Sequence, residues 1–146
     1  MSRKSTLDPL TGVFNRYVLD HIKCEATDYV VVVDLDKFKE LNDKHGHDFG
    51  DRVLIELVSV MQETINSGDS IIRFGGDEFI LILQSEPQLI MDEVKTKFTQ
   101  RLSEHDVSFT YGIEKYRNSI TDTIKLADAR MYRSKHVARE RGKSVE

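Results

Sequence analysis

Two apolar runs separated by a short acidic segment constrain this chain more than any other feature. The first run enters the pair Gly75 and Gly76, Asp77 and Glu78 follow, and residues 79–83 (Phe-Ile-Leu-Ile-Leu) form the second run. A glycine pair between strand-like runs predicts a β-hairpin, because glycine tolerates the positive φ that a tight turn requires. The two acids would then be fixed on a rigid ribbon, which suits a metal or phosphate site. Acids in hairpin turns are also common as solvated side chains, so this motif alone leaves both interpretations open.

The composition is typical of one globular domain, 1–146, that buries its own core. Of the 146 residues, 39% are hydrophobic and 32% are charged. The formal net charge of −4 disfavours generic nucleic-acid binding through a basic surface. Cys24 is the only cysteine, which excludes intrachain disulfides and cysteine-rich zinc sites. The longest apolar run, 29–33, is too short to cross a bilayer, and no signal peptide is visible. We expect a cytoplasmic domain with a short N-terminal segment 1–7 and a frayed tail 140–146.

Hydrophobic periodicity predicts alternating groups of helices and strands in the order α, β, α, α, β, β, α, β, α. The β-branched run near the start is typical of a strand covered on both faces. The predicted strands are 28–34, 70–74, 78–83 and 107–114. The predicted helices are 15–24, 36–44, 48–66, 87–102 and 119–139, the last with Ser119 as its N-cap.

Two acids follow the first predicted strand. Asp34 stands at its end and Asp36 two residues later, so in extended geometry they share one face. If the chain turns into a helix at this point, Asp36 is a helix N-cap or first-turn acid, and we favour that interpretation. If the strand neighbours the hairpin, Asp34, Asp77 and Glu78 converge and repel one another unless a cation or proton intervenes. An all-oxygen cluster favours a hard cation such as Mg²⁺, which usually completes its shell with substrate phosphates.

Three polar residues near the junction of the second and third predicted helices offer a site for a nucleotide base. The carboxylate of Asp51 could accept from the N1–H and N2–H₂ groups of guanine, while Asn42 could donate to N3 or O6. His47 lies between them in the sequence. Helix capping is the simpler explanation for Asn42 and Asp51, and His47 could be an ordinary exposed residue.

Lys135 and Arg139 lie one turn apart on the last predicted helix and therefore share a face. Two cations on one face could clamp a triphosphate. Because residues 130–143 are basic throughout, a solvated helix end that complements the helix dipole is an alternative that composition does not separate.

Together these motifs resemble the GGDEF domain of the diguanylate cyclase family. The similarity extends over nearly the whole chain, from Asp8 to Arg139. Several ordered blocks at the family's spacing are far more specific than the five-letter motif alone. The matching blocks are 8–16 (Asp-Pro-Leu-Thr-Gly-Val-Phe-Asn-Arg), 34–39, 41–43, 46–47, 50–51, the intact motif at 73–79, 127–128, 131–132 and Lys135.

The resemblance implies an α+β, palm-like fold, with a central, mostly antiparallel five-stranded sheet flanked by helices, similar to class III nucleotide cyclases. The implied reaction condenses two GTP into cyclic di-(3′,5′)-guanylate and two pyrophosphates. The implied cofactor is Mg²⁺ or Mn²⁺. The implied partners are a second copy of the domain, in a transient homodimer, and an upstream sensory or dimerisation domain. We expect neither nucleic acid nor a membrane as a partner of this chain.

The same resemblance assigns roles to residues. It implies a metal site made by Asp34, the carbonyl of Leu35, Asp77 and Glu78. It implies that Asp77 accepts the 3′-hydroxyl proton and that Lys39 stabilises charge on the phosphates, with Glu78 supporting the metal. Because a carboxylate is a weak base, we expect the metal to supply most of the activation. The implied substrate-binding residues are Asn42, His47, Asp51, Gly75, Gly76, Lys135 and Arg139.

One departure from the family's pattern bears on regulation. The product-inhibition motif of the family is Arg-x-x-Asp just before the hairpin, whereas residues 66–69 here are Asn-Ser-Gly-Asp. Asn66 cannot make the bidentate contacts of arginine, so we expect weak or absent product inhibition. The alternative function is a catalytically silent regulatory module that binds GTP or a partner; the intact acids Asp34, Asp77 and Glu78 speak against it.

Overall fold

The computed structural model describes residues 5–145, with side chains through Val137. Residues 1–4 and 146, which belong to the terminal segments 1–7 and 140–146 of the sequence analysis, lie outside the described residues. The elements are β1 (Phe14–Asn15), the 3-10 helix η1 (Arg16–Asp20), β2 (Tyr29–Leu35), α1 (Phe38–His45), α2 (His47–Thr64), β3 (Ser70–Arg73), β4 (Glu78–Leu83), α3 (Pro87–Arg101), β5 (Phe109–Lys115) and α4 (Ile120–Val145). Within residues 5–145, no helix is long and apolar enough to cross a lipid bilayer.

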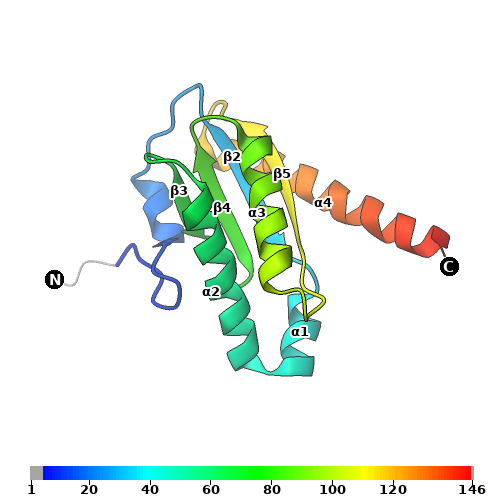
Figure 1. The fold of residues 1–146 in the computed structure, drawn as a ribbon. Helices are drawn as coiled ribbons and strands as arrows, with labels where there is room; N and C mark the ends of the chain where they lie inside the picture. Colours follow the sequence, from blue (N-terminus) through cyan, green and yellow to red (C-terminus); the bar gives the residue numbers. More distant parts are fainter. Residues whose placement is uncertain (1–4, 146) are drawn as a thin grey trace.

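A five-stranded sheet in the order β1-β3-β4-β2-β5 forms the centre of the molecule (Figure 1). β2 lies between β4 and β5 and is antiparallel to both, and β3 is antiparallel to β4. The short β1 pairs with β3 in parallel. The sheet is therefore mixed and mostly antiparallel, which confirms the predicted α+β fold class.

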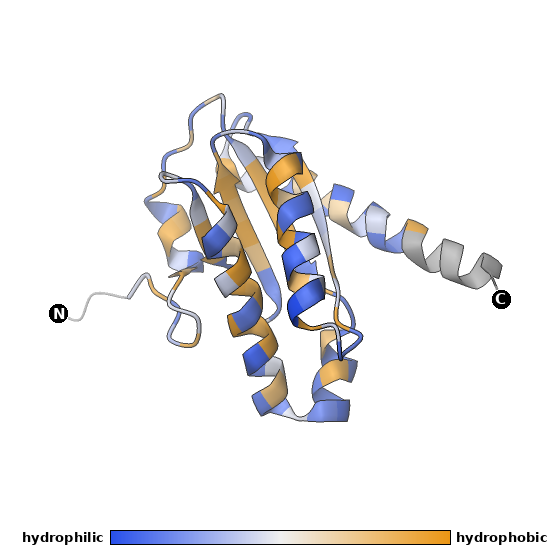
Figure 2. Ribbon diagram, viewed as in Figure 1, coloured by the Kyte–Doolittle hydropathy of each residue, from blue (hydrophilic) through white to orange (hydrophobic). Residues whose placement is uncertain are grey.

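β2 is buried on both faces because its side chains alternate between two cores. Val31, Val33 and Leu35 pack in the core under α2 and α3. Val30 and Val32 pack in the core on the other face, with residues of η1 and α4. The apolar inner faces of the sheet and helices are visible in Figure 2. This double burial explains the continuous β-branched run, since burial of each such side chain stabilises the fold by about 1.5–3 kcal/mol.

Helix α4 packs closely against β5 at Gly112. A Cβ at this position would lie 2.2 Å from the carbonyl oxygen of Ala127 and 2.5 Å from the backbone nitrogen of Met131. The helix therefore depends on a residue without a side chain at this crossing. Its start is as predicted, because Ser119 Oγ accepts from the Asp122 N–H at 3.1 Å. Its end lies beyond the predicted one, at Val145.

The predicted helix over 15–24 is wrong. Asn15 belongs to β1, and its side chain accepts from the Tyr17 N–H to start a 3-10 helix of only five residues. The N–H groups of His21 and Ile22 both donate to the Val18 carbonyl, which closes this turn. β1 was missed because a strand of two residues leaves no periodic pattern in a sequence.

The hairpin is present, but the reason given for its glycines is wrong. In the described chain the glycines with positive φ are Gly12, Gly46 and Gly68. Gly75 and Gly76 lie instead in a four-residue connection between β3 and β4, where the Phe74 and Gly75 N–H groups both donate to the Glu78 carbonyl. A longer connection needs no left-handed residue at these two positions.

Gly112→Ala tests the close crossing of α4 over β5. The new methyl group would overlap backbone atoms of α4, which cannot move aside as a flexible side chain can. We expect a loss of about 1–3 kcal/mol in the free energy of unfolding, measured by chemical denaturation. Gly76→Ala is the matched control, because a Cβ at that position meets nothing within 4 Å. Equal stability of the two variants would contradict this account of the crossing.

Candidate active site

Asp34, Asp77 and Glu78 meet where β2 ends beside the hairpin. The register of β2 and β4 places Asp34 opposite Glu78. The Leu35 N–H donates to the Asp77 carbonyl at 3.1 Å, which ties the hairpin connection to the end of β2. Burial raises the pKa of Asp34, the hydrogen bond from Lys135 opposes that rise, and repulsion from Asp77 adds to it. The sequence predicted that these three carboxylates would converge if the strand that ends at Asp34 lay beside the hairpin. The pairing of β2 with β4 meets that condition.

A fourth carboxylate, Asp128 of α4, adds to this charge. Burial raises the pKa of Glu78 to about 7, and repulsion from Asp128, then from Asp34 and Asp77, contributes to the rise. The sequence analysis gave Asp128 no role in the site. Its spacing offered a signal, because Asp128 and Lys135 are seven residues apart and so lie on the same face of a helix.

Lys135 of α4 faces the acids directly. Its Nζ donates to Asp34 Oδ2 at 2.8 Å and lies 3.6 Å from Asp36 Oδ1. Lys135 is therefore held in an ion pair at the end of β2, and a simple solvated position is wrong for this residue. The side chain of Arg139 lies outside the described residues, so its predicted role beside Lys135 stays a prediction.

Asp36 has a different position from the helix N-cap that we favoured. Its Oδ2 accepts from Ser108 Oγ at 2.7 Å, and its Oδ1 accepts from Thr110 Oγ1 at 2.7 Å. Helix α1 begins only at Phe38, after Lys37, whose φ of 53° turns the chain out of the strand. The capping interpretation is wrong because two hydroxyls of the β5 region hold this carboxylate.

The hairpin connection is braced by residues that the sequence analysis did not assign to the site. Arg73 Nη2 donates to the Gly76 carbonyl at 2.8 Å, and its Nη1 contacts Asp8 Oδ1 at 3.2 Å. Asp8 Oδ2 also accepts from Thr11. Burial works against ionisation of Asp8, but the bonds from Thr11 and Arg73 hold its pKa below the ordinary value. Gly76 is exposed, with open space where a side chain would stand, so a ligand can approach the braced connection.

The acids fit a hard divalent cation chemically. Asp34 Oδ1 is buried and has no hydrogen-bond partner. A buried carboxylate oxygen without a donor, next to other acids, has the chemistry of an oxygen ligand for Mg²⁺ or Mn²⁺. Among the described side chains, no group of three or more acids, histidines or cysteines is already arranged as a metal cage. In this arrangement the Lys135 ammonium is the cation that contacts Asp34.

Asn42 and Asp51 come close through Gly50. Asn42 lies within α1 and Asp51 within α2, so capping of a helix end by these residues is wrong. A Cβ on Gly50 would lie 1.8 Å from Asn42 Oδ1, which shows that the amide rests on the backbone next to Asp51. That Oδ1 is buried and has no hydrogen-bond partner within the protein. Gly50 is a site residue that sequence reasoning missed.

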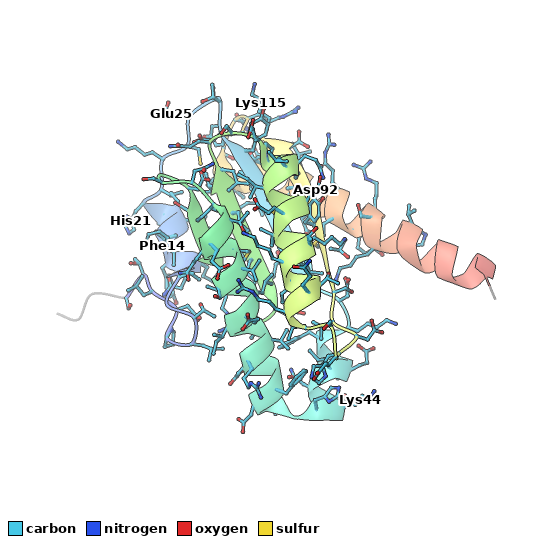
Figure 3. All side chains as sticks on the ribbon, viewed as in Figure 1. Phe14, His21, Glu25, Lys44, Asp92 and Lys115 are labelled. Atoms are coloured by element: carbon cyan, nitrogen blue, oxygen red, sulfur yellow. The ribbon has the colours of Figure 1, made fainter. Side chains whose placement is uncertain are left out.

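The remaining predicted residues lie on the elements that carry these two groups. His47 is exposed at the start of α2, next to Asp51, and Lys39 is exposed in the first turn of α1. This end of the molecule is marked by Lys44 in Figure 3. The carbonyl of Leu35 belongs to the last residue of β2, immediately after Asp34. The described contacts thus comprise an acidic cluster, the Lys135 ammonium against it, and a separate amide with an unmade hydrogen bond.

Comparisons with known proteins identify the family of this chain. The family model of the diguanylate cyclase GGDEF domain matches residues 5–141. Diguanylate cyclase DgcM of Escherichia coli K12 is 31% identical over 151 residues, and probable diguanylate cyclase DgcJ of the same strain is 29% identical over 150 residues. Each alignment covers 92% of this chain but only 37% of DgcM and 30% of DgcJ. This chain therefore spans about a third of the length of these relatives.

The fold also has solved counterparts. The GGDEF domain of DgcB from Caulobacter crescentus, in complex with c-di-GMP, superimposes with a TM-score of 0.80 at 26% identity. That match covers 94% of this chain and 92% of the DgcB domain. By sequence, fold and extent of the match, this chain belongs to the GGDEF domain family of diguanylate cyclases.

Proposed function

We propose that this domain is a diguanylate cyclase that condenses two GTP into cyclic di-(3′,5′)-guanylate and two pyrophosphates. The observation that carries the proposal is the convergence of Asp34, Asp77 and Glu78 beside the ammonium of Lys135. Phosphoryl transfer depends mainly on positioning and on neutralisation of charge, and these groups provide both.

Asp34, Asp77, Glu78 and the Leu35 carbonyl are the groups that would hold Mg²⁺ or Mn²⁺. When bound, such an ion lowers the pKa of a coordinated hydroxyl and neutralises phosphate charge. Asp77, on the connection braced by Arg73, takes the proton of the 3′-hydroxyl as the bond to the α-phosphate forms. Pyrophosphate is the leaving group.

The cations of the site balance the charge of the phosphates. Lys135 exchanges its contact with Asp34 for a phosphate oxygen, and Lys39 of α1 supplies a second positive charge to the phosphates. Arg139, one turn beyond Lys135, adds a second cation from α4. Gly75 and Gly76 present backbone without side chains, so the nucleotide can approach the hairpin closely.

Guanine is the base that the polar groups of α1 and α2 fit. Asp51 accepts from its N1–H and N2–H₂ groups, and Asn42, held against Gly50, completes the contact. His47 lies beside the base. Adenine lacks the N1–H and N2–H₂ donors, so it would leave the Asp51 carboxylate unpaired.

The reaction requires two domains. Each holds one GTP, and each 3′-hydroxyl must attack the α-phosphate held by the other copy. A second copy of this domain is therefore the catalytic partner, and an upstream sensory or dimerisation domain would raise the local concentration of the pair. We also propose weak product inhibition. The Asp69 carboxylate accepts from the N–H groups of Asn66 and Gln84, so it is already used in local structure.

One observation favours a second function, a regulatory module that binds GTP without turnover. Lys135 contacts Asp34 directly, and no ready-made metal cage is present among the described side chains. If that ion pair persists when GTP binds, the metal site does not form. Tight binding of GTP without cyclic product, in a variant fused to a dimeriser, would support this function over the cyclase.

Asp77→Ala tests the cyclase directly in a dimeriser fusion supplied with GTP and Mg²⁺. Loss of this ligand and proton acceptor should reduce formation of cyclic di-GMP at least about a hundredfold, measured by chromatography of the products. The unfolding temperature should change little, because the Leu35 N–H pairs with the backbone carbonyl of residue 77 and not with its side chain. Asp106→Ala removes an exposed acid outside the site and should retain activity. Full activity of Asp77→Ala would refute the assignment.

Gly50→Ala tests whether the contact with Gly50 positions the Asn42 side chain. The new methyl group collides with the end of the Asn42 side chain, which must move away from Asp51. Alanine is a good helix former, so we expect α2 to remain folded while KM for GTP rises about tenfold. Asn42→Ala should have a similar effect, and combination of both changes should add little, since they act on one contact. Additive losses would show that Gly50 acts in another way.

Glu78 makes stability depend on pH in the absence of metal. Because its folded-state pKa is raised to about 7, the protonated form stabilises the fold at low pH, and this stabilisation is lost as the pH rises through about 7. In EDTA, the unfolding temperature should fall as the pH rises from about 4.5 to about 7, and it should fall less in Glu78→Gln. Glu104→Gln, an exposed control, should behave like the unmodified protein. Magnesium should reduce the fall, and identical profiles for all variants would contradict the crowding of these acids.

A further inference from the structure

The outer edge of β5 pairs with no strand among the described residues. In the described chain β2 is its one strand neighbour, because β5 ends the order β1-β3-β4-β2-β5. Two hydrogen bonds fix the pattern of the ladder. Asp36 N–H donates to the Ser108 carbonyl at 2.9 Å, and Tyr116 N–H donates to the Asp28 carbonyl at 2.8 Å.

These two bonds determine which backbone groups of β5 face outward. In an antiparallel pair, residues that exchange hydrogen bonds alternate with residues that do not. Since Ser108 and Tyr116 both bond towards β2, the even-numbered residues between them do so as well. The N–H and C=O groups of Tyr111 and Ile113 therefore point away from β2, towards the open edge.

A groove of about 550 Å³ follows this edge. Four consecutive residues of β5, 110–113, line it. Since successive side chains of a strand point to opposite faces, four consecutive lining residues place the groove at the strand's edge, not over one face of the sheet. Residues of α3 and α4 form its two walls, and Figure 1 shows β5 bordered by these two helices.

The groove is basic although the chain as a whole is acidic. Lys95 of α3 and both Arg130 and Arg133 of α4 line it. None of the described side chains that line it is a carboxylate, whereas the formal net charge of the chain is −4. Figure 3 marks this side of the molecule with Asp92 on α3 and Lys115 at the end of β5.

Two of these cations are held in place by neighbours. Glu114 accepts from Arg130 Nε at 2.6 Å, which fixes that guanidinium beside the strand. The Lys95 ammonium lies 5.8 Å from the ring centroids of Phe109 and Tyr111, so its charge stays over β5. Glu114 balances the charge of Arg130, so Lys95 over the strand and Arg133 of α4 supply the net positive charge beside the outward backbone groups.

We propose that the edge of β5 binds an extended acidic segment of a partner protein as a sixth strand. The backbone of that segment pairs with the N–H and C=O groups of Tyr111 and Ile113, which supplies affinity without regard to sequence. Lys95 and Arg133 contact carboxylates on the two faces of the added strand, which selects an acidic sequence. This surface does not depend on the chemistry of the candidate active site.

The probe is a fluorescent six-residue peptide that alternates glutamate and valine, titrated into the full chain with polarisation as the readout. The same peptide with lysine in place of glutamate is the charge control, and a version methylated at alternate amides is the pairing control. We expect binding of the glutamate peptide alone, weakened by salt because exposed charges are screened. Hydrogen exchange should slow at the amides of Tyr111 and Ile113, and not at Gly112, which already faces β2.

A charge reversal locates the site. Arg133→Glu should weaken the glutamate peptide about tenfold, through loss of one ion pair and gain of a repulsion. Lys125→Glu makes the same charge change on α4 outside the groove and should leave binding unchanged. Unchanged affinity in Arg133→Glu, equal binding of the lysine peptide, or protection at other amides would overturn the proposal. Protection of Tyr111 and Ile113 that rises with protein concentration and needs no peptide would also overturn it, because the occupant would then be a second copy of this chain.

Discussion

The pairing of β2 with β4 is the constraint on which the rest of the structure depends. It places Asp34 opposite Glu78, two residues that are far apart in the sequence. The register is strongly specified, because a slip of one residue would turn the side chains of β2 from one core to the other and carry Asp34 to the opposite face. The two hydrophobic cores on either side of β2 fix its register. The same register fixes the positions of the acids in the site.

Convergence of acids costs free energy, and the structure shows where that cost is offset. Lys135 neutralises part of the charge at Asp34, while the pKa of Glu78 rises to about 7 because burial and three other acids disfavour its ionised form. The hairpin connection cannot move away from the other acids, because two contacts hold it. Arg73 links it to Asp8, and the Leu35 N–H of β2 donates to the Asp77 carbonyl. A site held under such repulsion suits a divalent cation, which supplies the positive charge that the fold leaves missing.

Long, strongly patterned elements could be predicted from the sequence, and short or tertiary features could not. The run in β2, the two hairpin strands and the long helices carry their own periodicity, so their positions were close to those observed. β1 and the five-residue η1 carry too little pattern, and Asp36 resembles a helix cap until Ser108 and Thr110 are brought next to it. Asp128 and Gly50 gain their meaning only from neighbours across the fold.

By itself, the sequence determined the class and order of the long elements, the hairpin with its acids and the resemblance to the GGDEF family, because these depend on local periodicity and on residues at fixed spacing. Tertiary structure alone decided that Lys135 binds Asp34, that Asn42 rests on Gly50 and that α4 crosses β5 at Gly112. It also decided that β5 has a free, basic edge. The physical reason is that contacts between distant segments depend on strand register and helix crossing, which the balance of packing over the whole chain sets.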